Sequence, residues 1–458
     1  MPNTIETPAA DSSSQPSSSS FVGRLVQRYG GWTTRISGAL IDQALFSGSN
    51  FVINVALANW MFEDEYGAFV VVYSWFLLLQ NLYEAVMVEP MSIYGAGKHA
   101  HRFRQYLGYL FFGHIGFGFM AFAVLGAAAI FSSISDTGIV SGALMGAAIG
   151  SPFLLLRWLT RQPFYILSKP HWSALGGFIY LGVTMLALYI FNVQGWLNAF
   201  TALMALAVGS VISAAFLAIV FLHPNLRLKA HDTMDARSIL RDHWQYGRWS
   251  TADRILGWIP ANFHYVVLPL LFSLAESGAL RAVLNLTMPI TLGIVAINGL
   301  LLPSFVRKYS TGGRSAVDQQ LVFALKLVLF FTGLYFVGVV LFGGPLLSFI
   351  YNGRYDEYVT FPLLLTMGAW PVIMGGSVVV DAALRATGRV KYSFISKIIP
   401  ALITVTIGLG LLAAFKLVGA NLNMMIVNLV MLGISLWFYV RVSDDKTKND
   451  EPLQEARQ

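Results

Sequence analysis

Long apolar runs separated by short polar turns recur along nearly the whole chain. The first two runs cover 36–62 and 66–94, and the acidic turn 63–65 joins them. Each run exceeds the roughly 20 residues that an α-helix needs to cross about 30 Å of hydrocarbon. Further runs follow at 106–131, 138–160, 172–191, 197–222, 249–272, 279–304, 321–343, 360–383, 392–415 and 420–441. The pattern predicts an all-α polytopic membrane protein with about 12 transmembrane helices.

Polar residues in the first two runs gather on one helix face. The stripes comprise Gln43, Ser47, Asn50 and Asn54 in the first run, and Tyr73, Gln80 and Glu84 in the second. Because a polar stripe is costly in lipid, each stripe should face other helices or water. Two interpretations stay open: the side chains hold helices together by hydrogen bonds, or they line a water-filled cavity. The carboxylate in the second stripe favours the cavity.

The composition supports a membrane protein rather than a soluble protein with an anchor. Hydrophobic residues make up 56% of the chain and charged residues only 12%, against about 25% charged residues in soluble domains. The chain has no cysteine, so it has neither disulfides nor thiolate metal sites. Metal-binding histidine spacings are also absent, and we expect neither a metal nor a cofactor. Every predicted loop is short, which leaves no room for a catalytic domain, so we expect no enzyme.

The basic residues fall mainly on one side of the predicted spans. Clusters of arginine and lysine occur at 24–35, 98–104, 157–169, 227–248, 307–314 and 385–391, all on the side of the N-terminus. On the opposite side only Arg281, Arg354 and Lys416 lie near the loops. Cytoplasmic loops carry such an excess, so both termini should be cytoplasmic. The net charge of +7 is therefore a topology signal that also suits anionic membrane lipids, and not a nucleic-acid footprint.

The polar segments outside the spans divide the chain. Residues 1–20 are rich in serine and should form a disordered cytoplasmic tail, as should 443–458. Residues 21–35 combine arginines with aromatic residues and suit the headgroup layer, and Gly30-Gly31 would let the chain turn into the first span. A second cytoplasmic linker with an interfacial helix is expected at 224–247.

A weak internal repeat relates the two halves. The turn Glu65-Tyr66-Gly67 matches Glu276-Ser277-Gly278 at an offset of 211 residues. Further matches in the same order pair Trp32 with Trp244, Pro90 with Pro303 and Lys169 with Arg389. The chain thus divides into an N-lobe, 21–223, and a C-lobe, 248–442, each with six spans. An even number of spans per half relates the lobes by an axis along the membrane normal, as in transporters that work by alternating access.

Ionisable and amide side chains within the spans are candidates for function. For substrate binding we select Asn50, Asn54, Gln80, Arg254, Arg281 and Asn285, and for coupling or gating Asp42, Glu84, Glu89 and Asp253. The planar guanidinium of arginine suits phosphate oxygens, and aromatic rings such as Tyr73, Trp75, Trp258 and Tyr265 would stack on sugars or form interface belts. The alternative for Arg281 is a structural ion pair with Glu276. Arg157, Lys326 and Lys397 lie near cytoplasmic ends, where long side chains snorkel.

The opening spans resemble a known family. The segment 43–75, the Glu65-Tyr66-Gly67 turn and the Glu89-Pro90 pair are similar to the N-terminal part of Wzx-type lipid-linked oligosaccharide flippases of the MOP superfamily, to which the MATE exporters also belong. The rest of the chain agrees only in span number, short loops and repeat. The resemblance implies a MOP/MATE-like fold in the bacterial inner membrane.

The same resemblance implies a substrate. It would be an undecaprenyl-diphosphate-linked oligosaccharide for surface or exopolysaccharide synthesis, with a polysaccharide polymerase and export proteins as partners. A MATE-like antiporter of small organic cations is the alternative, although such a pump needs an acidic cavity and the candidate charges here are mixed. A polytopic polymerase or glycosyltransferase is a third hypothesis, and the short loops argue against it.

Overall fold

The computed structural model describes residues 21–134, 138–222, 235–388 and 390–441, so both predicted tails lie outside the described residues. The described part is helical. Its first half comprises α1 (Phe21–Trp60), α2 (Glu63–Tyr83), the π-helix η1 (Glu84–Val88), α3 (Glu89–Ala96), the 3₁₀ turn η2 (Ala100–Arg102), α4 (Phe103–Ile134), α5 (Gly138–Ile166), α6 (Pro170–Val193) and α7 (Ala199–Leu222). Its second half comprises α8 (Ala236–Leu271), α9 (Leu274–Asn285), α10 (Met288–Tyr351), the 3₁₀ turn η4 (Asp356–Tyr358), α11 (Phe361–Ala386), α12 (Val390–Val405) and α13 (Ile407–Arg441).

These helices cross the bundle twelve times, as expected. In the described part of the chain, 8 helices are long and apolar enough to span a membrane by length and composition alone. The 64-residue α10 holds two crossings, because the chain reverses at Gly313, where φ is +62°. Only glycine adopts that conformation without strain. α13 changes direction in the same way at Lys416, with φ at +49°.

Two local expectations were wrong. α1 is one continuous helix of 40 residues, so Gly30-Gly31 does not turn the chain between an interfacial segment and the first span. The segment 344–358, expected as the longest outer loop, is helical as far as Tyr351. In both cases backbone hydrogen bonding continues the helix through residues that the hydropathy pattern assigned to turns. α8 is continuous over 36 residues, so the helix expected within 224–247 continues into the expected seventh span.

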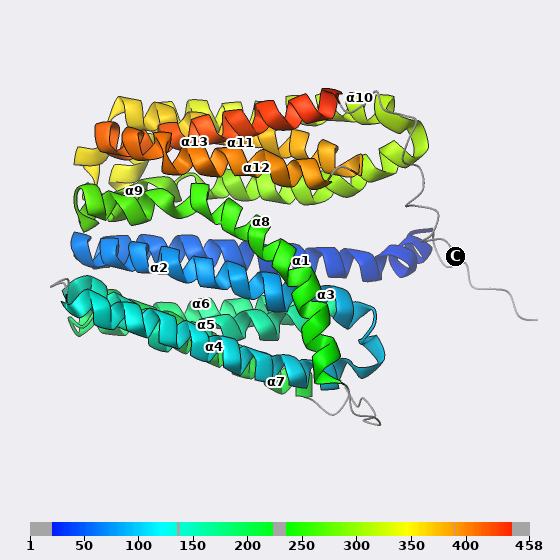
Figure 1. Cartoon of the computed structure of the whole chain (residues 1–458), viewed down its shortest axis with the longest axis horizontal. Coiled ribbons are helices and arrows are strands. Elements are labelled where there is room, and N and C mark those ends of the chain that lie inside the picture. Colours follow the sequence, from blue (N-terminus) through cyan, green and yellow to red (C-terminus); the bar gives the residue numbers. More distant parts are fainter. Residues whose placement is uncertain (1–20, 135–137, 223–234, 389, 442–458) are drawn as a thin grey trace, which may run out of the picture.

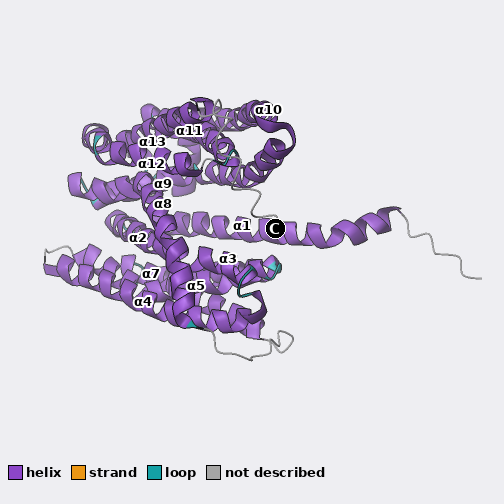
Figure 2. Cartoon of the chain, turned by 45° about the vertical axis from the view of Figure 1, so that its right-hand side comes forward, coloured by secondary structure: helices purple, strands orange, loops and turns teal. Residues whose placement is uncertain are grey.

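The helices form two lobes that meet along a central seam (Figure 1). α4 to α7 pack together in the N-lobe, where α5 and α7 contact α2 and α6 contacts α1, and α10 to α13 pack together in the C-lobe. The seam consists of α1, α2, η1 and α3 on one side and α8 and α9 on the other. α8 crosses diagonally from the C-lobe over α2 and α3 to the edge of the N-lobe, as Figures 1 and 2 both show.

The two turns that the sequence repeat pairs lie against each other at one end of the seam, which the charge distribution predicts to be the outer end. A Cβ on Gly67 would lie 1.9 Å from the carbonyl oxygen of Leu274, and one on Gly278 would lie 3.0 Å from the Tyr66 ring. The glutamates that begin these turns, Glu65 and Glu276, make equivalent contacts within their own lobes. Glu65 accepts from the backbone N–H of Ala199 at the start of α7, and Glu276 accepts from Lys416. Each turn therefore ties its lobe's last crossing to the seam.

Candidate functional site

The outer half of the seam contains an arginine held by both lobes. Arg281 on α9 donates from Nε to the Oδ1 atom of Asn54 on α1 at 3.2 Å, and its guanidinium lies 5.7 Å from the Tyr265 ring centre. Tyr66 on α2 donates to the same Asn54 oxygen at 3.5 Å. Glu276, the structural partner considered for Arg281, pairs instead with Lys416 at 2.8 Å. Arg281 is thus bound by amide and aromatic groups rather than by a carboxylate.

A second arginine lies inside the N-lobe. Arg157 on α5 is 9% exposed, and its guanidinium carbon lies 3.6 Å from the Tyr180 ring centre and 5.4 Å from that of Phe46. Such cation–π contacts stabilise a cation by about 2 kcal/mol or more when the site is desolvated. They leave the guanidinium without a carboxylate in contact, and Asp42 acts on it only from a longer distance.

The two arginines share an aromatic neighbourhood without acidic partners. In the described part of the chain, neither Arg157 nor Arg281 has a carboxylate oxygen within 4.0 Å, whereas Arg161 and Arg254 do. Tyr73 on α2 interacts electrostatically with both guanidinium groups. Tyr73 belongs to a ladder of rings along one face of α2, made of Tyr66, Phe69, Tyr73 and Phe76 with centroid separations of 6.3, 5.4 and 5.7 Å. We call Arg157, Arg281 and this ladder of rings the cationic centre.

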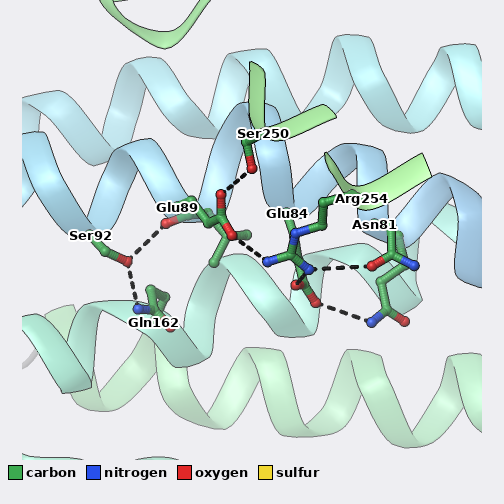
Figure 3. A network of polar contacts seen from close by, with 9 residues as sticks. Asn81, Glu84, Glu89, Ser92, Gln162, Ser250 and Arg254 are labelled. Carbon is green, nitrogen blue, oxygen red and sulfur yellow. Dashed lines mark hydrogen bonds and ion pairs between the residues drawn. The ribbon is translucent and has the colours of Figure 1, made fainter. Parts of the chain in front are cut away.

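The other half of the seam, which the charge distribution predicts to be the cytoplasmic half, holds an ion network instead (Figure 3). Arg254 on α8 donates through NH1 to Glu84 on η1 and through NH2 to Glu89 on α3. Ser250 donates to the other oxygen of Glu89, and Gln80 donates to the other oxygen of Glu84 at 3.2 Å. All four carboxylate oxygens therefore have donors. Since the glutamates belong to the N-lobe and the arginine to the C-lobe, this seam network clamps the lobes together.

The π-helical turn explains how two glutamates five residues apart reach one guanidinium. Residues i and i+5 of a regular α-helix point about 140° apart. In η1 the backbone N–H of Glu89 bonds to the carbonyl of Glu84, an i to i+5 bond that brings both side chains to the same face. Pro90 assists, because it has no N–H to offer the carbonyl of Val86. That carbonyl accepts from His243 Nδ1 at 2.8 Å instead.

The other predicted site residues lie in separate environments. Asp42 is buried in the N-lobe and accepts from Arg161 and Tyr165, and Asp253 accepts from Lys397 at 2.6 Å within the C-lobe. Asn285 is 1% exposed and donates to the Tyr351 hydroxyl at 3.1 Å. Asn50 contributes its backbone carbonyl, which accepts from Asn54 at 2.8 Å.

The ten predicted residues are thus not one constellation. The structure brings Arg254, Glu84, Glu89 and Gln80 together, and it separately joins Asn54 to Arg281. Arg157, Tyr66 and Tyr180 were not among the predicted site residues. Arg157 was assigned to the end of a span predicted at 138–160, but α5 continues to Ile166 and places it deeper. The i, i+3, i+7, i+10 spacing of rings from Tyr66 to Phe76 was the available signal for the ladder.

An outer latch closes the opposite end of the seam. Arg354, just beyond α10, donates to the carbonyls of Ala58 and Asn59 at 3.1 Å each. Tyr355 also donates to the Ala58 carbonyl at 3.2 Å, and Asn59 donates to the carbonyl of Ile350 at 3.0 Å. These bonds satisfy carbonyls at the C-terminal end of α1 that the helix leaves unpaired. The C-lobe therefore caps a helix of the N-lobe.

Comparison with solved structures identifies this architecture. The inward-facing conformation of a multidrug resistance MATE family transporter of the MOP superfamily superposes with a TM-score of 0.74 at 14% identity, covering 88% of this chain and 94% of that one. The chain has the fold of the MOP-superfamily transporters. The expected MOP/MATE-like fold of two lobes is confirmed, and the 8 helices of the described part that are long and apolar enough to span a membrane agree with it.

Two further structures are informative. The outward-facing conformation of a multidrug resistance MATE family transporter gives a TM-score of 0.66 at 14% identity, over 89% of this chain and 95% of that chain. A MOP-superfamily transporter from Pyrococcus furiosus, whose binding pocket is described as having reverse polarity that suggests a different function, gives 0.66 at 15% identity over 89% and 95%. No family model matches the sequence, and no curated protein matches it.

Proposed function

We propose that this protein is a flippase that moves an undecaprenyl-diphosphate-linked oligosaccharide repeat unit across the bacterial inner membrane. The observation that carries the proposal is the cationic centre. Arg157 and Arg281 have no described carboxylate partner, and the Tyr73 ring lies within electrostatic range of both. A buried cation is costly unless it is paired, so an anion is the ligand that this centre needs. A diphosphate supplies oxygens in the geometry that a guanidinium binds bidentately.

The surroundings of the arginines suit a glycan attached to that anion. Hydroxyl groups cannot cross hydrocarbon without replacement of their hydration. Asn54 and the phenols of Tyr66, Tyr73 and Tyr180 would supply hydrogen bonds, and the ring ladder of α2 would supply faces for stacking on sugars. The lipid tail would stay in the bilayer while the polar head passes between the lobes, as the resemblance to Wzx-type flippases implies.

A MATE-like antiporter of organic cations is the competing function, and the distribution of charge disfavours it. A cation needs an available carboxylate, but Asp42 already accepts from Arg161 and Tyr165. Glu84 and Glu89 are occupied by Arg254 in the same way. The reverse polarity described for the binding pocket of the Pyrococcus furiosus transporter is a precedent for pockets of different polarity within this fold.

Alternating access requires the lobes to rock about the seam. In this structure the outer latch and the seam network both hold the lobes together, which suits an occluded state between the two open ones. The seam network would open to admit the glycan, and the outer latch would open to release it. Protonation of Glu84 or Glu89 would release Arg254 and so couple the seam network to protons. Both termini would be cytoplasmic, and a polymerase and export proteins would receive the product.

The test is export in cells that lack this gene and carry variants on a plasmid. Arg157→Gln and Arg281→Gln should each lower the appearance of the glycan outside by about 10- to 100-fold, because a lost charge-assisted hydrogen bond is worth roughly 1.5–3 kcal/mol. Glu84→Ala should also lower export. Arg385→Gln, which breaks an ion pair within the C-lobe, is the matched control. Membrane abundance is measured for every variant.

Efflux of organic cations is measured in the same cells. If the arginine variants export glycan normally, or if loss of the gene impairs cation efflux and leaves the glycan unchanged, the flippase proposal is wrong. A reporter fused after Gly313 tests the topology separately, and it should read cytoplasmic.

A further inference from the structure

The first thirteen residues of α8, 236–248, have two opposite faces, and we call this segment the α8 foot. One face packs on the N-lobe through Ile239, Asp242, His243 and Gly247, all of which are buried. A Cβ added to Gly247 would lie 3.1 Å from the Cα of Val86, so the foot lies directly against η1. The foot therefore belongs structurally to the N-lobe, although α8 continues into the C-lobe.

Polar contacts fix the orientation of the foot. Asp242 accepts from Lys98 at 2.6 Å, and its backbone carbonyl accepts from Tyr94 at 3.3 Å. Because the Val86 carbonyl only accepts, His243 donates to it from Nδ1 and accepts at Nε2 from the Tyr106 hydroxyl, at 2.6 Å. These bonds hold the foot in one rotation about its axis, so the face turned away from the N-lobe is equally well defined.

That outward face is basic and aromatic. Its members follow the helical spacing i, i+3, i+4, i+7 and i+11, and they are Arg237, Leu240, Arg241, Trp244 and Arg248, all exposed. Leu240 is 71% and Trp244 63% exposed, which is unusual for side chains that a fixed helix presents to water. The first four of these residues line an open hollow of about 370 Å³. Within the described residues, none of the three arginines has an acidic partner.

We propose that the outward face of the α8 foot binds anionic phospholipid headgroups of the cytoplasmic leaflet. Arginines bind phosphate oxygens, and tryptophan and leucine enter the boundary between headgroups and acyl chains. The location argues for lipid rather than a soluble acidic protein, because the seventh span expected from the sequence, 249–272, begins directly after the foot. The arginine positions are thereby at headgroup level. α8 as a whole joins both lobes, so lipid bound at its foot would steady the helix about which they would move.

The proposal is tested by native mass spectrometry of the purified full-length protein in detergent, titrated with phosphatidylglycerol or phosphatidylcholine. The variant is Arg237→Gln/Arg241→Gln. Its matched control is Arg307→Gln/Lys308→Gln, which removes two exposed charges from the cytoplasmic end of the C-lobe. Trp244→Ala separately removes the aromatic contribution. Circular dichroism and thermal unfolding check that each variant is folded.

Wild-type protein should retain phosphatidylglycerol in preference to phosphatidylcholine. The foot variant should bind phosphatidylglycerol about 25-fold more weakly, since each basic residue at an anionic surface contributes roughly a fivefold factor. The control should lose less than threefold. Equal loss in the foot and control variants, or equal retention of both lipids by wild type, overturns the proposal. A dimer that only the foot variant abolishes also overturns it, because the face would then bind a second copy.

Discussion

The seam network makes a quantitative prediction about lobe movement. Arg254 compensates Glu84 and Glu89 across the seam, and their side chains are 25%, 14% and 30% exposed. Removing one partner of a fully buried ion pair costs about 3–5 kcal/mol, whereas an exposed pair is worth at most about 1 kcal/mol. For this partly buried triad we expect Arg254→Gln to destabilise the clamped seam by about 2 kcal/mol. That corresponds to a roughly 30-fold shift toward states open at the cytoplasmic end.

The assay uses pairs of spin labels, for which the cysteine-free chain needs no background substitutions. Cysteines at the exposed positions His101 and Ser310 would report the cytoplasmic separation of the lobes, and cysteines at Gln194 and Glu357 the outer separation. Double electron–electron resonance in nanodiscs then gives the distance distributions. In Arg254→Gln the cytoplasmic pair should gain a longer-distance population.

Two comparisons make this prediction specific. Glu84→Gln should shift the distribution less than Arg254→Gln does, because Glu89 still pairs with Arg254 and no like charges are left facing each other. Lys397→Gln breaks the pair with Asp253 inside the C-lobe and should leave the distances unchanged. If Lys397→Gln shifts the distances as much as Arg254→Gln, or if the order of the two seam variants is reversed, the seam network does not clamp the lobes.

Three further predictions concern the ends of the seam. Gly67→Ala should lengthen the outer label distance, because the added Cβ would overlap a backbone carbonyl of α9. Gly116→Ala is the control and should leave the distance unchanged, because a Cβ added there has no neighbouring atom within 4 Å. Arg354→Ala removes two bonds to α1 and an ion pair, so it should raise the outer-open population about fivefold in the same measurement, and an unchanged distribution would contradict the latch. Burial lowers the pKa of His243, so the docked foot favours the neutral imidazole. Amide hydrogen-exchange protection of 236–248 should therefore fall as the pH drops below about 6.5. Constant protection down to pH 5 would refute this.

The spans were predictable because lipid enforces a simple rule. Every backbone polar group must be satisfied within the helix, so each crossing leaves an apolar run of about 20 residues in the sequence. The turn repeat was also visible, since Gly67 and Gly278 are needed where two backbones approach closely. Continuity through Gly30-Gly31 was not predictable from such patterns, because glycine permits a turn without requiring one.

The site was less predictable because its partners are distant in sequence. Arg254 was selected as a substrate ligand, but its contacts with Glu84 and Glu89 span 170 and 165 residues. Only the packing of α8 across α2 and α3 reveals that it is already compensated. For Arg157 the error was the opposite, because a residue of the site was left out of it. The predicted span ended six residues too early, so this buried cation was expected to snorkel toward the membrane surface. The two arginines therefore differ in charge compensation: Arg254 is paired with carboxylates and Arg157 is not.

The spacing of Glu84 and Glu89 connects these observations. In a regular helix, two glutamates five residues apart would point to different surfaces, and a single arginine would compensate only one of them. The π turn changes that, and the missing N–H of Pro90 leaves one carbonyl free for His243 on the same α8 helix that carries Arg254. One local irregularity of the N-lobe thus provides two attachment points for α8, one ionic and one through a carbonyl. In the proposed rocking cycle, a helix attached at both points would transmit movement of the C-lobe directly to η1 and α3 of the N-lobe.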